Sequence, residues 1–189
     1  MDYKQQVTSV TTPFQTIDIY DTIIGPTREF VAFHKSLNDD DDSSYHAEHK
    51  DFFRPDRMIF LDGTLQSRLQ ADSEYHESLT HPALFSHENP KRVAIIGGGE
   101  GATLREVLKH KTVEQVVMIE IDQMMVEVSS QYLPQWSDCS NLEGINSTCW
   151  EDPRVQVFFE DAFQWFFDRF SGDPEIEEDP FDVIIMDAL

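Results

Sequence analysis

The sequence predicts an α/β protein with a Rossmann-like parallel sheet, preceded by a small N-terminal β-hairpin domain. Three observations predict this fold. After Pro90, short apolar strands alternate with helical patterns, which is typical of a parallel sheet covered by helices. A glycine loop, Gly97–Gly101, joins the first of these strands to a helix. Before Pro90, short β-like runs dominate.

The N-terminal part, residues 1–72, is predicted to form the small β domain. Its β-like runs are Phe14–Tyr20, Arg28–Phe33, Met58–Leu61 and Thr64–Leu69. The turn pair Asp62-Gly63 between the last two runs indicates a hairpin. Residues 35–57, which include the run Asp39–Asp42, repel one another and predict an inserted acidic loop. A connecting helix is expected within residues 73–90.

Residues 91–189 are predicted to form the Rossmann-like domain, with its first four strands only and therefore incomplete at the C-terminus. The expected strands and helices are Arg92–Ile96, Ala102–His110, Gln115–Ile121, Gln123–Leu133, Val155–Phe159, an aromatic helix over 163–170, and Phe181–Met186. We expect the aromatic stripe to pack in the core and the strand Phe181–Met186 to lie at an exposed edge.

Charge and composition exclude several functions. Asp and Glu number 36 against 14 Lys and Arg, a net charge of −22, which repels nucleic acid and attracts cationic partners. No apolar run reaches the length of a membrane span. No secretory signal is visible, so we expect a cytoplasmic chain in which Cys139 and Cys149 stay reduced. No metal site is predicted, because His46 and His49 lie in the acidic loop.

Acidic residues follow the predicted strands where a Rossmann-like sheet binds its ligand. Glu120, Asp161 and Asp187 each end a strand, and the glycine loop ends the first one. An acid in the position of Glu120 is placed to accept ribose hydroxyls. Glu100 lies inside the glycine loop, where a carboxylate suits a neutral or cationic ligand better than a pyrophosphate. Adenosine joined to a sulfonium that carries an amine would fit.

Several motifs, in one order, give the sequence a specific resemblance. They are Leu61-Asp62-Gly63-Thr64-Leu65-Gln66, Glu74-Tyr75-His76-Glu77, Gly97-Gly98-Gly99-Glu100-Gly101, Ile119-Glu120-Ile121-Asp122 and Asp182-Val183-Ile184-Ile185-Met186-Asp187. The chain resembles the polyamine aminopropyltransferases, the spermidine and thermospermine synthases. The resemblance implies a fold like that of S-adenosylmethionine methyltransferases, and transfer of an aminopropyl group from decarboxylated S-adenosylmethionine to an amine, releasing methylthioadenosine. It implies no bound cofactor.

The resemblance also implies roles for individual residues. Asp187 matches the catalytic proton acceptor. Tyr75 and His76 match a pair that reaches donor and acceptor, and Glu100 matches the acid that holds the amine of the aminopropyl arm. The remaining matches concern donor binding: Gln15, Gln66, Gly97, Gly99, Glu120, Asp161 and Ala162.

Alternatives remain open for the acceptor and the activity. Glu100 in the glycine loop and the segment Glu77–Leu84 resemble the thermospermine synthase branch and favour spermidine as acceptor, with putrescine as the alternative. A methyltransferase that uses S-adenosylmethionine is a second alternative. The family continues beyond Asp187 with further strands and helices, so a fragment or an inactive chain is the third, and we expect little turnover from these 189 residues alone. A full-length protein is expected to be a homo-oligomer.

Overall fold

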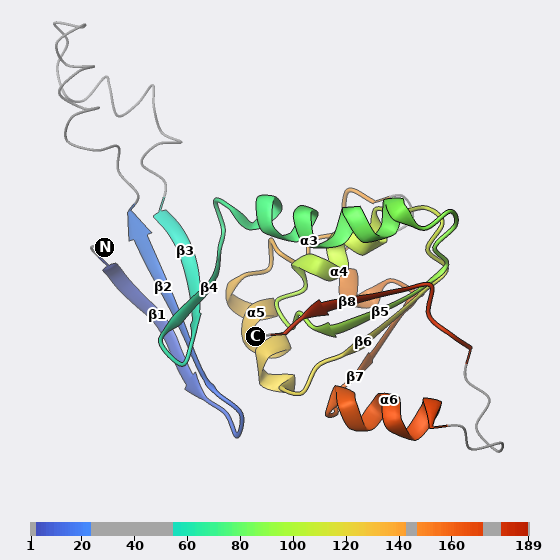
Figure 1. The fold of residues 1–189 in the computed structure, drawn as a ribbon. Helices are drawn as coiled ribbons and strands as arrows, with labels where there is room; N and C mark the ends of the chain where they lie inside the picture. The colour runs from blue at the N-terminus through green and yellow to red at the C-terminus, as the bar shows by residue number, and fades with distance from the viewer. Residues whose placement is uncertain (1–2, 24–54, 143–146, 172–178, 189) are drawn as a thin grey trace, which may run out of the picture. The chain divides into compact units, whose positions relative to one another are not determined.

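The computed structural model describes residues 3–23, 55–142, 147–171 and 179–188. Contacts divide the chain into two compact units. The first contains residues 1–10 and 16–70, and the second contains residues 11–15 and 71–189. Each unit has a sheet of its own (Figure 1).

The first unit is built on a four-stranded sheet with the order β1-β2-β3-β4. Its strands are β1 (Tyr3–Thr11), β2 (Thr16–Ile23), β3 (Pro55–Leu61) and β4 (Thr64–Arg68). The strands β2, β3 and β4 pair antiparallel, and Asp62-Gly63 forms the predicted tight turn between β3 and β4. The strand β1 was not predicted, because its side chains are mostly polar. The predicted strand Arg28–Phe33 lies outside the described residues.

The second unit contains a parallel sheet with the order β7-β6-β5-β8, which confirms the predicted Rossmann-like fold. In chain order its elements are α3 (Asp72–Ser86), β5 (Arg92–Gly97), α4 (Ala102–Leu108), β6 (Gln115–Ile119), α5 (Gln123–Tyr132), the 3-10 turn η2 (Cys149–Glu151), β7 (Val155–Phe158), α6 (Ala162–Phe170) and β8 (Val183–Asp187).

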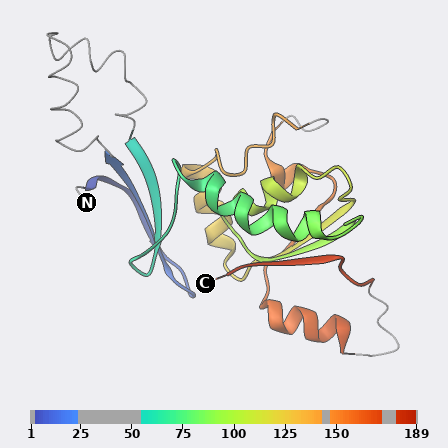
Figure 2. The ribbon, with the colours of Figure 1, turned by 45° about the horizontal axis from the view of Figure 1, so that its top comes forward.

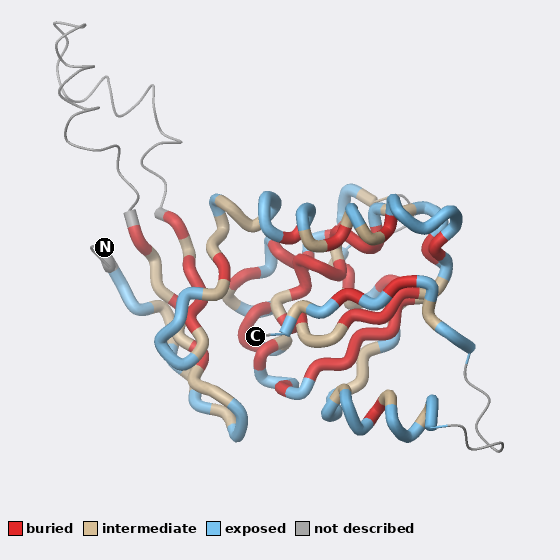
Figure 3. The backbone as a smooth tube through the Cα atoms, viewed as in Figure 1, coloured by how far each residue is buried: buried red, intermediate tan, exposed pale blue. Residues whose placement is uncertain are grey.

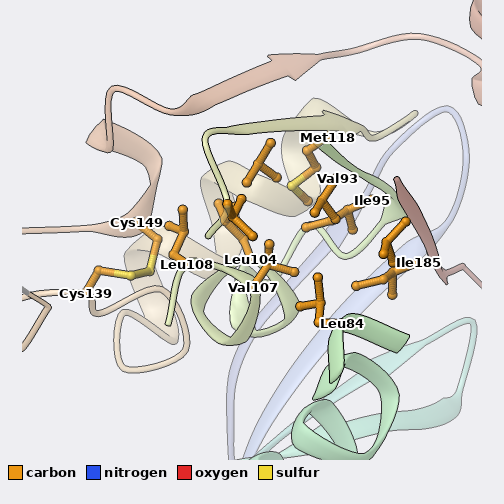
Figure 4. Packing of buried hydrophobic residues seen from close by; sticks show 13 residues of the cluster. Leu84, Val93, Ile95, Leu104, Val107, Leu108, Met118, Cys139, Cys149 and Ile185 are labelled. Atoms are coloured by element: carbon orange, nitrogen blue, oxygen red, sulfur yellow. A yellow bond between two sulfur atoms is a disulfide. The ribbon is translucent and has the colours of Figure 1, made fainter. Parts of the chain in front are cut away.

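Both faces of this sheet are covered by helices (Figures 1 and 2). The helices α3 and α4 pack on one face, where Leu84 and Leu104 meet buried residues of β5, β6 and β8 (Figure 4). The helix α6 covers the other face, and Trp165 packs there against Val117 and Ile119 of β6. Alternating side chains of β6 therefore enter opposite cores, as the period of a strand requires.

The strand β8 forms one edge of the sheet, as the sequence predicts. Its burial alternates along the strand (Figure 3). Val183 and Ile185 are buried, whereas Ile184 and Met186 are 53% and 66% exposed. The apolar composition of this segment thus reflects one buried face only.

The structure corrects two expectations about packing. The aromatic stripe of α6 was expected in the core, but Phe163 and Phe167 are 81% and 59% exposed, and only Trp165 is fully buried. A single helix face can cover the sheet, so aromatic residues at consecutive positions cannot all enter the core. The acidic loop was expected to reach Arg57, but β3 already begins at Pro55; residues 24–54 lie outside the described residues.

The expectation of reduced cysteines is wrong. Cys139 and Cys149 form a disulfide whose two residues are completely buried and belong to the core shared with α4 (Figure 4). Backbone hydrogen bonds bring the two together, because Cys149 N donates to the carbonyl of Ser137 at 2.8 Å. The sequence separation of 10 residues gave no sign of this return of the chain.

Candidate active site

The site lies where the strand order of the second unit reverses. The chain passes from β5 to β6 and β7 on one side, and β8 returns on the other side of β5. The carboxyl ends of β5 and β8 are thus neighbours, with Gly97 aligned to Asp187 (Figure 1). This reversal is the place where parallel α/β sheets bind ligands.

Glycine is required at two positions of the loop after β5. Gly97 has a φ of 78°, and a Cβ there would lie 2.4 Å from the backbone oxygen of Asp187. A Cβ at Gly99 would lie 2.9 Å from Oε2 of Glu120 and 2.6 Å from the Met125 side chain. Both glycines therefore allow the acidic strand ends to approach the loop closely.

Three predicted side chains meet at this point. His76 from α3, Glu100 from the glycine loop and Asp187 from β8 each place a ligating atom within 4.8 Å of the others. His76 Nε2 and Glu100 Oε1 are 3.1 Å apart, and the hydroxyl of Tyr75 donates a hydrogen bond to Asp187 Oδ1 at 3.2 Å. We call His76, Glu100 and Asp187 the acid cluster. Its atoms are spaced closely enough to surround a metal ion or an ammonium group.

The surroundings of Asp187 raise its pKa to about 6. Burial is the main cause, and the charge of Glu100 adds to it. Hydrogen bonds from Thr103 and Tyr75 and the proximity of His76 act in the opposite direction. A carboxyl with this pKa exchanges protons near neutral pH, as a proton acceptor in catalysis must.

The pKa values of the two aromatic neighbours are also shifted upward. Burial and the Asp187 carboxylate raise the pKa of Tyr75 to about 12, which keeps its hydroxyl protonated. Burial alone would lower the pKa of His76, but the hydrogen bond to Glu100 and the charges of Glu100 and Asp187 raise it overall. The acid cluster therefore favours bound protons and positive charge.

Glu120 lies at the end of β6, and the backbone fixes its carboxylate. Gly99 N donates to its Oε2 at 3.0 Å and Asp122 N donates to its Oε1 at 2.9 Å. Burial nevertheless raises the pKa of Glu120 above its usual range. Because each carboxylate oxygen has a second lone pair, both oxygens can still accept a hydrogen bond from a hydroxyl group of a ligand.

Gln15 groups with the second unit and lies beside the residues that follow β6. Its Nε2 donates to Asp122 Oδ2 at 3.1 Å, and Thr12 Oγ1 donates to the same oxygen at 2.7 Å. Asp122 is almost completely buried and also caps α5 by accepting from Met124 N. Gln15 and Glu120 are thus connected through Asp122.

The remaining predicted residues lie elsewhere. Asp161 follows β7 and caps α6, where its Oδ1 accepts from Gln164 N at 3.0 Å; Ala162 is the first residue of that helix. Both follow a strand that is parallel to β6, so they stand at the carboxyl edge of the sheet. Gln66 lies on β4 in the first unit, and its role stays a prediction.

Two residues of the site were not assigned a role from the sequence. Thr103 is fully buried and donates to Asp187 Oδ2 at 2.6 Å. No local pattern marks it, because it lies 84 positions from its partner. Asp122 could have been assigned, since it follows Glu120 by two positions and therefore shares the end of β6.

The fold and the site together define a class of protein: a Rossmann-like chain whose glycine loop carries an acid, Glu100, instead of a phosphate-binding cation. The spermine/spermidine synthase domain matches residues 72–189. The chain belongs to the spermine/spermidine synthase family, as the sequence motifs indicated.

Curated relatives and solved structures agree with this membership. The chain is 45% identical over 131 residues to polyamine aminopropyltransferase 1 of Hyperthermus butylicus, covering 69% of this chain and 40% of that protein. It is 39% identical over 141 residues to polyamine aminopropyltransferase 2 of Pseudomonas aeruginosa, covering 74% and 35%. A spermidine synthase in complex with the transition-state analogue AdoDATO superposes with a TM-score of 0.69 at 29% identity, covering 100% of this chain and 48% of that one.

A second solved structure, spermidine synthase from Thermotoga maritima, gives a TM-score of 0.67 at 29% identity and covers 98% of this chain and 49% of that one. The chain therefore spans about two fifths of the length of these curated relatives and about half of each solved structure. None of the described helices has the length and apolarity needed to cross a bilayer.

Proposed function

We propose that the protein is a polyamine aminopropyltransferase, which transfers the aminopropyl group of decarboxylated S-adenosylmethionine to an amine. The observation that carries this proposal is the acid cluster beside the glycine loop. A ligand that places cationic groups there, with its ribose at Glu120, matches the charges of the site. The family relationship supports the same reaction.

The donor would be bound along the carboxyl ends of the strands. Glu120 would accept from the ribose hydroxyls, and Asp161 with Ala162 would contact the adenine. Gln15 would support this side through Asp122. Glu100 would hold the ammonium end of the aminopropyl arm, and Tyr75 and His76 would lie between the arm and the acceptor amine.

The transfer would be a direct displacement. The lone pair of the acceptor nitrogen attacks the carbon bonded to sulfur, a C–N bond forms, and the C–S bond breaks with its electron pair moving to sulfur. Methylthioadenosine leaves as a neutral thioether. Asp187 takes the proton that the new secondary ammonium loses, and its pKa of about 6 keeps most of it ionised at neutral pH. The chain itself provides mainly positioning.

Spermidine is the acceptor we favour, which would make the enzyme similar to thermospermine synthases. Glu100 in place of the aspartate usual for spermidine synthases, and the segment Glu77–Leu84, support this choice. The competing acceptor is putrescine. Supplying the protein with the donor and each amine in turn, and separating the products by chromatography, distinguishes the two: a tetraamine product supports spermidine, and a triamine product from putrescine alone contradicts it.

Donor binding tests the site independently of turnover. We expect calorimetry to show tighter binding of decarboxylated S-adenosylmethionine than of S-adenosylmethionine, because the carboxylate of the latter would approach Glu100. The variant Glu100→Gln should lose at least about tenfold in affinity for the decarboxylated donor, the effect of one charged hydrogen bond. The matched control is Glu114→Gln, which removes an exposed acid paired with Lys91.

A methyltransferase is the alternative that these measurements address. It would prefer S-adenosylmethionine, and Glu100→Gln would then improve binding by removing a repelled charge. Either result would overturn the aminopropyltransferase proposal. If the protein binds the decarboxylated donor selectively but forms no product, the result supports the donor site and contradicts the transfer activity of this chain.

A further inference from the structure

Two histidines face each other on the side of the sheet that α3 and α4 cover, outside the acid cluster. His81 lies on α3, and His110 follows the end of α4. The distance between His81 Nδ1 and His110 Nε2 is 2.9 Å, and the ring centroids are 5.1 Å apart. Two imidazole nitrogens at this distance either share one proton or direct two lone pairs at one metal ion.

The separation of the nitrogens defines the geometry that a metal would have. With metal–nitrogen bonds of about 2.0–2.1 Å, a separation of 2.9 Å corresponds to an angle at the metal of about 90°. This is the angle between neighbouring ligands of a square-planar or octahedral site, whereas a tetrahedral site needs a wider one. Nickel and copper(II) prefer this geometry with nitrogen and oxygen ligands.

The other nitrogen of His81 has the environment of a metal-binding histidine. Nε2 lies 3.3 Å from Oε2 of Glu106, whose side chain is fully buried. The carboxylate favours a proton on Nε2, which leaves the lone pair on Nδ1 toward His110. A carboxylate behind a ligating histidine fixes both the tautomer and the ring orientation.

Glu106 itself is a support and not a ligand. Arg105 Nε lies 2.9 Å from its Oε1, and Lys109 Nζ lies 2.6 Å from its Oε2. A cation bound directly by Glu77, His81 and Glu106 would compete with the ammonium of Lys109, which is 4.0 Å from Glu77 Oε1. The ion must therefore bind on the opposite side of the His81 ring.

Space for the remaining ligands is present on that side. A cavity of about 540 Å³ is lined by both histidines together with Phe85, His87, Glu88, Lys109 and Lys111. Phe85 packs against both imidazole rings, with centroids 5.7 and 5.0 Å away. Lys109 and Lys111 bring positive charge to the cavity wall, and Glu106 offsets that of Lys109. Water can complete the coordination.

We infer that His81 Nδ1 and His110 Nε2 bind a divalent transition-metal ion in cis positions, with water as the further ligands. The ion would fasten α3 to the segment after α4. The helices α3 and α4 also carry His76 and Thr103 of the active site. The metal would therefore stabilise the scaffold of the site without contacting the reacting groups.

The test uses Ni²⁺ alone as the probe and the whole chain as the protein. Other histidines also bind nickel, so His34, His46 and His49 are first replaced by Asn in a common parent. Calorimetry of the parent should show one site, and His81→Asn and His110→Asn should each weaken it by at least about tenfold. His87→Asn, which removes a histidine of the same cavity, is the matched control and should retain most of the affinity.

A second readout is the thermal midpoint with Ni²⁺ and with a chelator. Nickel should raise the midpoint of the parent and of His87→Asn, because it binds the folded state, and leave that of the His81 and His110 variants unchanged. Equal affinity in the parent and His110→Asn would overturn the inference, as would nickel binding that disappears only with His76→Asn. His110 is partly exposed, so its variant decides the question if His81→Asn does not fold.

Discussion

Two groups of ionisable side chains in the second unit behave in opposite ways. In the acid cluster, Asp187 has a carboxyl whose pKa is raised to about 6. In the group formed by Arg105, Glu106 and Lys109, which we call the ion-pair cluster, burial alone would raise the pKa of Glu106, but its hydrogen bonds to Lys109 and Arg105 lower it overall. Both carboxyls are removed from water, so the difference is the presence of cations.

This comparison shows which negative charge is structural and which is available to a ligand. The charge of Glu106 is neutralised within the chain and contributes to folding. In the acid cluster, His76 is the only basic side chain that lies beside the two carboxyls among the described residues, and the two acids repel one another. A cationic substrate would supply the missing positive charge. The net charge of −22 would attract such a substrate, and the acid cluster is where that substrate would bind.

The largest effect is expected from breaking the ion-pair cluster. The variant Glu106→Gln leaves the ammonium of Lys109 and the largely buried guanidinium of Arg105 without their common partner, and only Arg105 keeps a second close one, Asp72 at 2.8 Å. Loss of one member of a buried pair costs about 3 kcal/mol or more in the free energy of unfolding, measured by urea denaturation. Glu114→Gln breaks an exposed pair with Lys91 and should change little. Similar losses in both variants would contradict the assigned structural role.

Removing charge from the acid cluster should have the opposite effect on stability. Because the folded-state pKa of Asp187 is raised, its contribution is most favourable below the unfolded pKa near 4 and is lost as the pH rises through about 6. Asp187→Asn should therefore stabilise the protein at pH 7.5, by up to about 3 kcal/mol from about 1.4 kcal/mol per pH unit. The gain should vanish below pH 4.

The same variant tests the proposed chemistry. Asn cannot take a proton from the acceptor amine, so turnover should fall at least about a hundredfold, while donor binding stays close to that of the parent. The pair of measurements is thermal denaturation across pH and product formation at pH 7.5. A variant that is destabilised at neutral pH would refute the raised pKa, and one with normal turnover would refute the catalytic assignment.

The sequence alone was sufficient to predict the site residues that lie at the ends of strands. Glu120, Asp187 and the glycine loop follow apolar strands, and parallel strands bring such ends to one edge, so their order alone predicted the Rossmann-like sheet. The partners of these acids could not be predicted in the same way. The contact between Thr103 and Asp187 joins a helix and a strand that are distant in sequence, and periodicity carries no information about it.

Three errors have similar physical causes. The disulfide depends on the chain returning from Ser137 to Cys149, which composition does not reveal. The exposure of Phe163 depends on which face of α6 meets the sheet, and several faces of that helix are aromatic. The strand β1 is polar, so it lacks the alternation that marks half-buried strands.

The smallest effect is expected from Thr103, which donates a hydrogen bond to Oδ2 of Asp187 in the acid cluster. Its hydroxyl lowers the pKa of Asp187, so Thr103→Val should raise that pKa further. Because the ionised carboxylate accepts the proton in the proposed reaction, the acidic limb of the pH–rate profile should move upward by about half a pH unit to one unit, the equivalent of a hydrogen bond worth about 1 kcal/mol.

This shift separates a positioning role of Thr103 from a purely structural one. A structural defect would lower turnover equally at every pH, whereas an effect through Asp187 shrinks at high pH, where the carboxylate is ionised in both proteins. Thr103→Ser retains the hydroxyl and should restore the position of the limb. A limb that stays in place in Thr103→Val would mean that the 2.6 Å hydrogen bond does not control the proton acceptor.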